Sequence, residues 1–180
     1  MIATQLRASD SWFNPPIAFI THSPWQLVHA DIVLPDGRLL GSNICPGEMP
    51  DGKPVKSGVA IRPFNYGKPV RTLIVRYECT PEQAKLFYDT ALALCGVKFG
   101  WSRLFALAMP YESVKPWTQA QGFFCSELVA YCLKMAGILP FNPYIEPSAI
   151  TPRDLMTPNE AIWDAKDIVW LPANAGFWCK

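Results

Sequence analysis

The segment that most constrains the fold is a candidate β-hairpin at residues 26–43, QLVHADIVLPDGRLLGSN. Apolar residues alternate along its first half, and Pro35-Asp36-Gly37 supplies turn chemistry before a second apolar run, which is the pattern of two antiparallel strands. Because successive side chains of a strand point to opposite faces, His29 and Asp31 point away from the apolar set. The chain therefore contains at least part of an antiparallel sheet.

Further strands extend this sheet. The segments GVAIRPF (58–64) and RTLIVRYEC (71–79) predict two short strands separated by turn residues, and DIVWL (167–171) predicts a last one. Residues 45–57 are rich in proline and glycine and are expected to form a loop. The expected sheet is small and antiparallel.

Helix signals are equally clear. Thr80-Pro81 with Gln83 is typical of a helix start with a capping box, and that helix should run to about Leu94. The segment GFFCSELVAYCLKMAG (122–137) carries apolar residues at helical spacing and ends on a glycine. Two more Thr-Pro starts occur at 151 and 157. Strands and helices together predict an α+β fold, with the small antiparallel sheet packed against the helices.

Length and composition favour a single domain over residues 1–180, because half of the residues are hydrophobic and 23 are Trp, Tyr or Phe. Charged residues make up 17% and the formal net charge is +1, which gives no electrostatic footprint for nucleic acid or for a membrane surface. No stretch approaches the roughly 18 apolar residues of a membrane span, and the first residues do not resemble a signal peptide. We expect a protein without an integral membrane segment that is cytoplasmic as synthesised.

Cysteine usage argues against a metal site. The six cysteines form no CxxC pair, and the chain has only two histidines, His22 and His29. We expect no metal and no cofactor. Most of these thiols are expected to be small buried hydrophobes.

Cys125 differs from the other cysteines because it falls in the first turn of the helix expected at 124–137. Unpaired N–H groups and the positive end of the helix dipole favour an anion there, so this position suits a thiolate. A thiolate nucleophile needs a base, and histidine is the side chain suited to that role near neutrality. His22 lies in a loop-like segment and His29 on a strand, so His29 is the better candidate. The alternative is that Cys125 only packs in the core.

The two segments HADIVLPDG and FFCSELVAYCLKMAG resemble the circularly permuted NlpC/P60 family, papain-like cysteine amidases and peptidases related to the lecithin:retinol acyltransferase-like proteins. In this branch the histidine precedes the cysteine, as it does here. The resemblance covers about residues 21–155, so the N-terminal segment and the C-terminal tail are expected to be extensions. It implies a permuted papain-like fold in which Cys125 is the nucleophile and His29 the base.

The family usually places a third polar residue on the strand after the histidine strand, where it orients the imidazole. A two-residue turn at Asp36-Gly37 would bring Ser42 opposite Asp31 and onto the face of His29, and Ser42 is our first choice. A three-residue turn would instead bring Asn43 opposite His29. Asp31 is a substitute on the same strand. A backbone carbonyl or a water in place of any side chain is an equally good alternative.

The resemblance implies cleavage of amide bonds, most simply in the peptide stems of bacterial peptidoglycan. Upstream of the cysteine helix, four aromatic residues are candidates to line a substrate groove: Trp101, Phe105, Tyr111 and Trp117. A cell-wall substrate requires a route to the wall. Carriage in a bacteriophage virion, for example at a tail tip with virion proteins as partners, would provide one.

Two other functions remain open at this point. One is a lipid acyltransferase or thioesterase, which uses the same cysteine and histidine in the lecithin:retinol acyltransferase-like relatives. The other is a non-catalytic structural or binding protein on a decayed papain-like scaffold.

Overall fold

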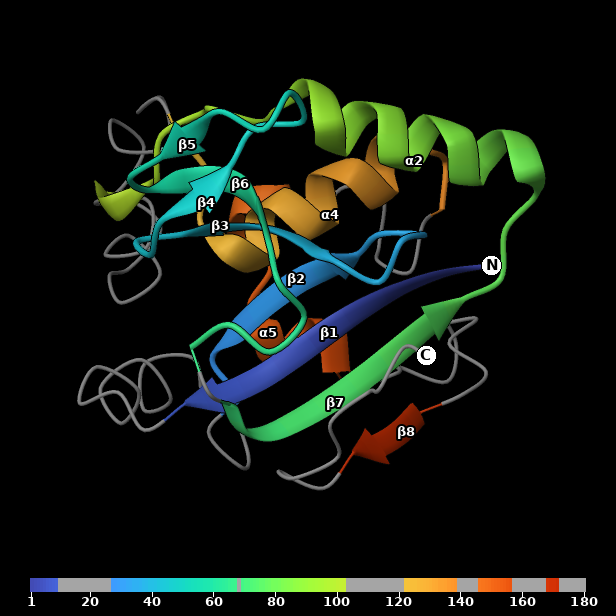
Figure 1. The fold of residues 1–180 in the computed structure, drawn as a ribbon. Helices are drawn as coiled ribbons and strands as arrows, with labels where there is room; N and C mark the ends of the chain where they lie inside the picture. Colours follow the sequence, from blue (N-terminus) through green and yellow to red (C-terminus); the bar gives the residue numbers. More distant parts are fainter. Residues whose placement is uncertain (10–26, 68, 103–121, 139–145, 157–167, 172–180) are drawn as a thin grey trace.

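The computed structural model describes residues 1–9, 27–67, 69–102, 122–138, 146–156 and 168–171. The fold is α+β, as expected, and its centre is one antiparallel sheet with the strand order β5-β4-β6-β3-β2-β1-β7-β8 (Figure 1). The strands are β1 (Ile2–Ser9), β2 (His29–Val33), β3 (Leu39–Asn43), β4 (Gly47–Glu48), β5 (Pro54–Val55), β6 (Gly58–Arg62), β7 (Pro69–Tyr77) and β8 (Ile168–Leu171).

The β2–β3 hairpin is confirmed, and its turn decides the register that the sequence left open. Leu34 N–H donates to the Arg38 carbonyl at 2.8 Å, so the loop has three residues, and its last residue, Gly37, has a φ of 83° that favours glycine. Ile32 pairs with Leu40. Continued along both strands, this register brings Asn43 opposite His29, as the three-residue alternative predicted.

The N-terminal segment is part of the sheet. The expectation of an extension outside the core is wrong for these residues, because β1 lies between β2 and β7 and pairs with both. Ile2 and Leu6 on this strand are buried in the core cluster. At the other end of the chain, β8 pairs with β7, where the sequence predicted a strand. Both terminal segments thus contribute strands to the sheet.

The helices begin where the capping signals predicted. In α2 (Pro81–Ala93), Thr80 Oγ1 accepts from Gln83 N–H at 3.2 Å and Gln83 Oε1 accepts from Thr80 N–H at 3.0 Å. Helix α4 (Cys125–Met135) ends in a Schellman motif, with Gly137 at a φ of 66° and Ile138 N–H donating to the Leu133 carbonyl. The Thr151-Pro152 start opens α5 (Pro152–Met156), preceded by a short 3₁₀ helix (Pro147–Ala149).

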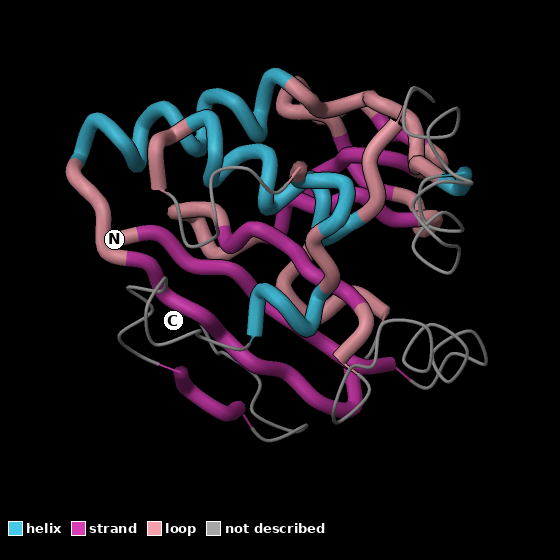
Figure 2. The backbone as a smooth tube through the Cα atoms, turned by 180° about the vertical axis from the view of Figure 1, so that it is seen from behind, coloured by secondary structure: helices cyan, strands magenta, loops and turns pink. Residues whose placement is uncertain are grey.

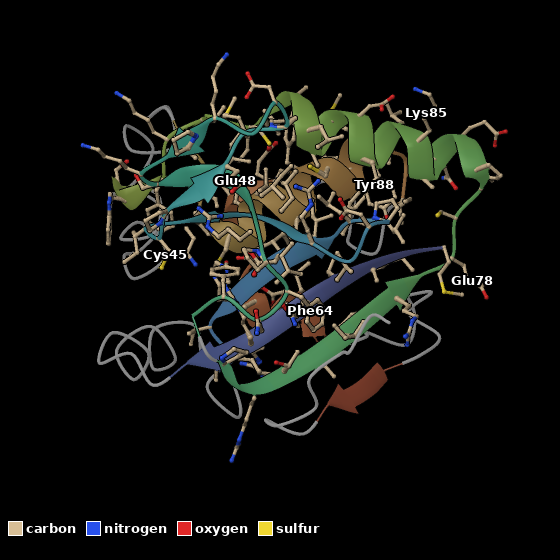
Figure 3. All side chains as sticks on the ribbon, viewed as in Figure 1. Cys45, Glu48, Phe64, Glu78, Lys85 and Tyr88 are labelled. Carbon is tan, nitrogen blue, oxygen red and sulfur yellow. The ribbon has the colours of Figure 1, made fainter. Side chains whose placement is uncertain are left out.

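The two faces of the sheet are covered differently. Helix α4 packs on β2 and β3, and α2 packs on α4. In the view from behind, α4 and α5 lie in front of the strands (Figure 2). On the opposite face, the loop between β6 and β7 crosses in front of β2 and β1 (Figure 1), and Phe64 lies on it (Figure 3). On β1 and β2, the polar side chains of Gln5, Arg7 and Asp31 are buried.

The start expected at Thr157-Pro158 lies outside the described residues. Among the helices that are described, none combines the length and the apolar character needed to cross a membrane.

Candidate active site

Cys125 is the first residue of α4, and the backbone around it is held in place by several contacts. The Phe123 carbonyl, two residues before the cysteine, accepts from the Ser42 hydroxyl at 2.5 Å and from Gly100 N–H at 2.9 Å. Cys125 itself is 6% exposed, and its Sγ lies 3.8 Å from the Val28 carbonyl oxygen. The thiol therefore lies at the N-terminal end of α4, beside the start of β2.

His29 is the first residue of β2, and its side chain is 16% exposed. Its Nε2 atom lies 2.9 Å from Asp31 Oδ1, 3.0 Å from the Tyr66 hydroxyl and 3.3 Å from Asn43 Nδ2. Because these three contacts all involve Nε2, the ring nitrogen left for Cys125 is Nδ1. A Cys–His pair in which Nε2 is tied to a polar side chain has the arrangement that proton transfer with a thiol needs.

The Asp31 side chain is fully buried, and three donors surround its carboxylate. The Tyr66 hydroxyl lies 3.0 Å from each of its oxygens, Arg7 Nη2 lies 3.2 Å from Oδ2, and His29 Nε2 lies near Oδ1. Gly41 of the neighbouring strand leaves the space for this carboxylate, since a Cβ there would collide with Asp31 Oδ1. A buried carboxylate satisfied in this way stays ionised.

The electrostatics of the pair follow from these contacts. Burial lowers the pKa of His29 by desolvation, but the charges of Asp31 and Cys125, together with hydrogen bonds to both, raise it to about 9. Desolvation raises the pKa of Asp31, but the charges of His29 and Arg7 lower it well below its usual range. His29 is therefore an imidazolium at neutral pH, paired with an Asp31 carboxylate on one side and close to Cys125 on the other.

The residues considered for the third position have different contacts. The Ser42 side chain is on the face away from His29, where its hydroxyl donates to the Phe123 carbonyl. Asn43 and Asp31 both lie on the His29 face and contact Nε2. The three-residue turn is the physical reason, because it shifts β3 by one residue and points Ser42 to the other side. The geometry thus favours Asp31, the substitute on the same strand, over Ser42.

Three residues of this cluster were not anticipated from the sequence: Arg7 on β1, Tyr66 on the β6–β7 loop and Arg62 on β6. Arg7 Nη1 donates to the Tyr66 carbonyl at 2.6 Å, and its guanidinium carbon lies 3.5 Å from the centre of the Tyr66 ring. Arg62 is buried and donates to five backbone carbonyls, which ties β3, β6 and the 45–46 segment together. A pattern of two buried arginines beside aromatic Tyr66 is visible only once the strands are paired.

The rest of the described chain offers no second centre of this kind. Within the described ranges, no three His, Cys, Asp or Glu side chains could hold a metal ion. The cysteines described are free thiols, and burial raises the pKa of Cys132 to about 12, as expected for a packing residue. Of the aromatic candidates, Trp101 is 46% exposed and stacks edge-on against Phe99.

Several expectations lie outside the described residues. They concern His22 and the three aromatic candidates Phe105, Tyr111 and Trp117.

Comparison of the chain with protein-family models, with curated proteins and with solved structures gave no match.

Proposed function

We propose that this protein is a cysteine hydrolase that cleaves amide bonds through an acyl-enzyme. The observation that carries the proposal is the placement of Cys125 in the first turn of α4, close to a His29 ring whose Nε2 is fixed on Asp31. A nucleophile, an acid–base group and an orienting group are the three parts of such a site.

The reaction follows from these positions. The Cys125 thiolate attacks the amide carbonyl carbon, and backbone N–H groups of the first helical turn, which lack intrahelical partners, stabilise the oxyanion. The His29 imidazolium gives its Nδ1 proton to the leaving nitrogen as the C–N bond breaks, which leaves an acyl-thioester and a neutral imidazole that keeps Nε2–H. That imidazole takes a proton from water, the hydroxide attacks the thioester, and the thiolate departs with the acid as product.

The fold we propose for this site is the circularly permuted papain-like arrangement. It is supported by the order of the two residues along the chain, with the histidine strand first and the cysteine helix second, and by the resemblance of both segments to the permuted NlpC/P60 family. By the same resemblance we propose the peptide stems of peptidoglycan as substrate. Carriage in a virion remains our proposal for how the protein reaches a cell wall.

The first test is digestion of defined muropeptides with purified protein, followed by mass analysis of the products. Cys125→Ser and His29→Gln should each lower turnover by about 10³-fold or more, since both groups act in the bond-breaking steps. Cys132→Ser is the matched control, because Cys132 lies on the same helix, buried and two turns away. Cleavage that survives Cys125→Ser would refute the proposal.

A second test needs no substrate. Iodoacetamide at about pH 6 to 7 alkylates thiolates, so Cys125 should react far faster than the other five cysteines, as read by peptide mass mapping. Equal, slow labelling of all six would favour the non-catalytic scaffold instead. Turnover of lipid esters with no cleavage of muropeptides would favour the lipid acyltransferase or thioesterase.

A further inference from the structure

The Tyr66 hydroxyl lies at the centre of the polar cluster and contacts three of its members. It is 3.0 Å from each oxygen of Asp31, 3.0 Å from His29 Nε2 and 3.2 Å from Asn43 Nδ2. Burial, followed by the charge of Asp31, raises the pKa of Tyr66 well above its ordinary value. The hydroxyl is therefore neutral, with one proton to donate and lone pairs to accept.

The orientation of Asn43 is fixed by the chain next to it. Its Oδ1 accepts from Cys45 N–H at 3.1 Å, so its NH₂ group points into the cluster. There Nδ2 lies within reach of two acceptors, the Tyr66 oxygen at 3.2 Å and His29 Nε2 at 3.3 Å. The NH₂ group has two N–H bonds that point well apart, but these two acceptors lie only 3.0 Å from each other. They therefore lie in the direction of the same N–H and compete for it.

The outcome of that competition shifts the balance between the two tautomers of His29, which Asp31 also influences. While Nε2 holds a proton for Asp31, it cannot accept from Asn43, so the amide must donate to Tyr66. Without the Tyr66 oxygen, the Asn43 N–H would be left facing Nε2. It would then favour the imidazole whose proton is on Nδ1, the nitrogen that has to accept a proton during the proposed reaction.

We infer that Tyr66 is a positioning residue that strengthens the preference of His29 for the Nε2–H tautomer set by Asp31, by accepting from Asn43 and donating to Asp31. The catalytic meaning of this inference rests on the proposed hydrolase function, but the tautomer itself does not. Arg7 holds Tyr66 in place from β1, through the stack on its ring and the hydrogen bond to its carbonyl. A loop residue thereby acts on the site through Asn43 and Asp31.

The experiment compares Tyr66→Phe, Tyr66→Phe with Asn43→Ala, and Tyr88→Phe. The Tyr66→Phe substitution would keep the ring on Arg7 and remove only the hydroxyl. Tyr88 on α2 is the matched control, since its hydroxyl donates to the Val33 carbonyl at 3.3 Å, at the other end of β2. Cys45, two residues after Asn43, and Tyr88 lie at opposite ends of the β2–β3 hairpin (Figure 3).

The readout is ¹⁵N NMR of histidine-labelled protein between pH 5 and 11, a range of about six pH units that spans the titration of both histidines. His29→Gln assigns the signal. In the wild-type protein the neutral His29 should carry its proton on Nε2. In Tyr66→Phe the share of the Nδ1–H tautomer should rise, although Asp31 still holds Nε2–H, and the ring should titrate at lower pH. Removal of the Asn43 amide in the double variant should reverse that rise. Tyr88→Phe should match the wild-type protein.

Turnover provides the second readout. Tyr66→Phe should lower kcat by about 10- to 100-fold, the usual range for an orienting partner, with KM changed by less than about twofold. An unchanged tautomer in Tyr66→Phe, or a shift that the double variant does not reverse, would overturn the inference while leaving the hydrolase proposal intact. Conversely, a shifted tautomer in a protein that cleaves no amide would refute the hydrolase and keep the role of Tyr66.

Discussion

Replacement of Asp31 by Asn is the most informative perturbation of the buried cluster. The change keeps the shape of the side chain and removes its charge, while His29 and Arg7 lose the carboxylate that both now contact. Among the influences that raise the His29 pKa, the charge of Asp31 comes first, ahead of Cys125. Asp31→Asn therefore tests whether this carboxylate is what keeps the imidazolium protonated.

The magnitude follows from the His29 pKa. A rise from 6.5 to about 9 corresponds to about 3–4 kcal/mol of extra stabilisation of the protonated form, at about 1.4 kcal/mol per pKa unit. Desolvation opposes this rise, so the attraction to Asp31 and Cys125 exceeds the net value. In Asp31→Asn, Cys125 is the one charge of these two that remains to oppose the lowering of the His29 pKa by burial. We expect the pKa of His29 to fall to about 7 or below.

The same linkage gives a pH dependence of stability. Because the folded state holds the His29 proton that the unfolded chain releases near pH 6.5, the free energy of unfolding should decrease as the pH rises from 6.5 to about 9. The Asp31 contribution has the opposite sign. Folding lowers the pKa of Asp31, so its carboxylate stabilises the folded state at pH values above the ordinary carboxyl pKa. This stabilisation is lost as the pH falls below about 4. Asp31→Asn should abolish both slopes.

The assays are urea unfolding at several pH values and NMR titration of histidine. At neutral pH the variant should be less stable by about 3 kcal/mol or more, because Arg7 loses its buried partner. Asp36→Asn is the matched control, an aspartate in the same hairpin that is half-exposed and paired with Arg38. A His29 that still titrates near 9 in Asp31→Asn, or a wild-type stability that is flat above pH 6.5, would refute this account.

Three further substitutions test neighbouring parts of the cluster by urea unfolding. Gly41→Ala should lower the free energy of unfolding by about 1–3 kcal/mol and reduce turnover, because the new Cβ would push the Asp31 carboxylate aside; a wild-type kcat would contradict this. Gln5→Met should raise the free energy of unfolding by about 1–2 kcal/mol, since the buried Gln5 amide has no hydrogen-bond partner within the described part of the chain; destabilisation would count against it. Ser42→Ala should cost about 1 kcal/mol through the lost bond to Phe123, and no loss would show that bond to be dispensable.

Much of the fold could be predicted because its signals are local. The capping box at Thr80 and the Schellman glycine at 137 depend on a few neighbouring residues. The first begins α2 and the second ends α4 where the sequence predicted. The position of Cys125 in the first turn of α4 follows from the same kind of reasoning. The hairpin itself was predicted, but its register depends on whether the loop has two residues or three. The sequence Pro35-Asp36-Gly37 is compatible with both loop lengths.

The partners of His29 could not be predicted because they come from non-local pairing. Along β1, Gln5 and Arg7 alternate with apolar residues, which is the pattern of a strand with one solvated face, yet both are buried. β1 lies in the interior of the sheet, and Tyr66 of the β6–β7 loop stacks on Arg7. Tyr66 lies in a turn segment whose composition predicts only a loop. A single sequence does not reveal that Tyr66 contacts Asp31 or that its ring stacks on Arg7.

The free energy needed to bury the charges of this cluster helps to decide between an enzyme and a decayed scaffold. Burying a carboxylate and two cations requires desolvation that their mutual attraction only partly offsets, and apolar residues of similar size would often serve stability as well or better. A chain under selection for structure alone would gain from replacing Asp31 and Arg7 together. The cluster instead satisfies the Asp31 carboxylate with donors from β1, β2 and the β6–β7 loop, while all of its contacts to His29 are to Nε2. Such an arrangement leaves Nδ1 available to a thiol, and a function that uses this nitrogen is what would offset the cost.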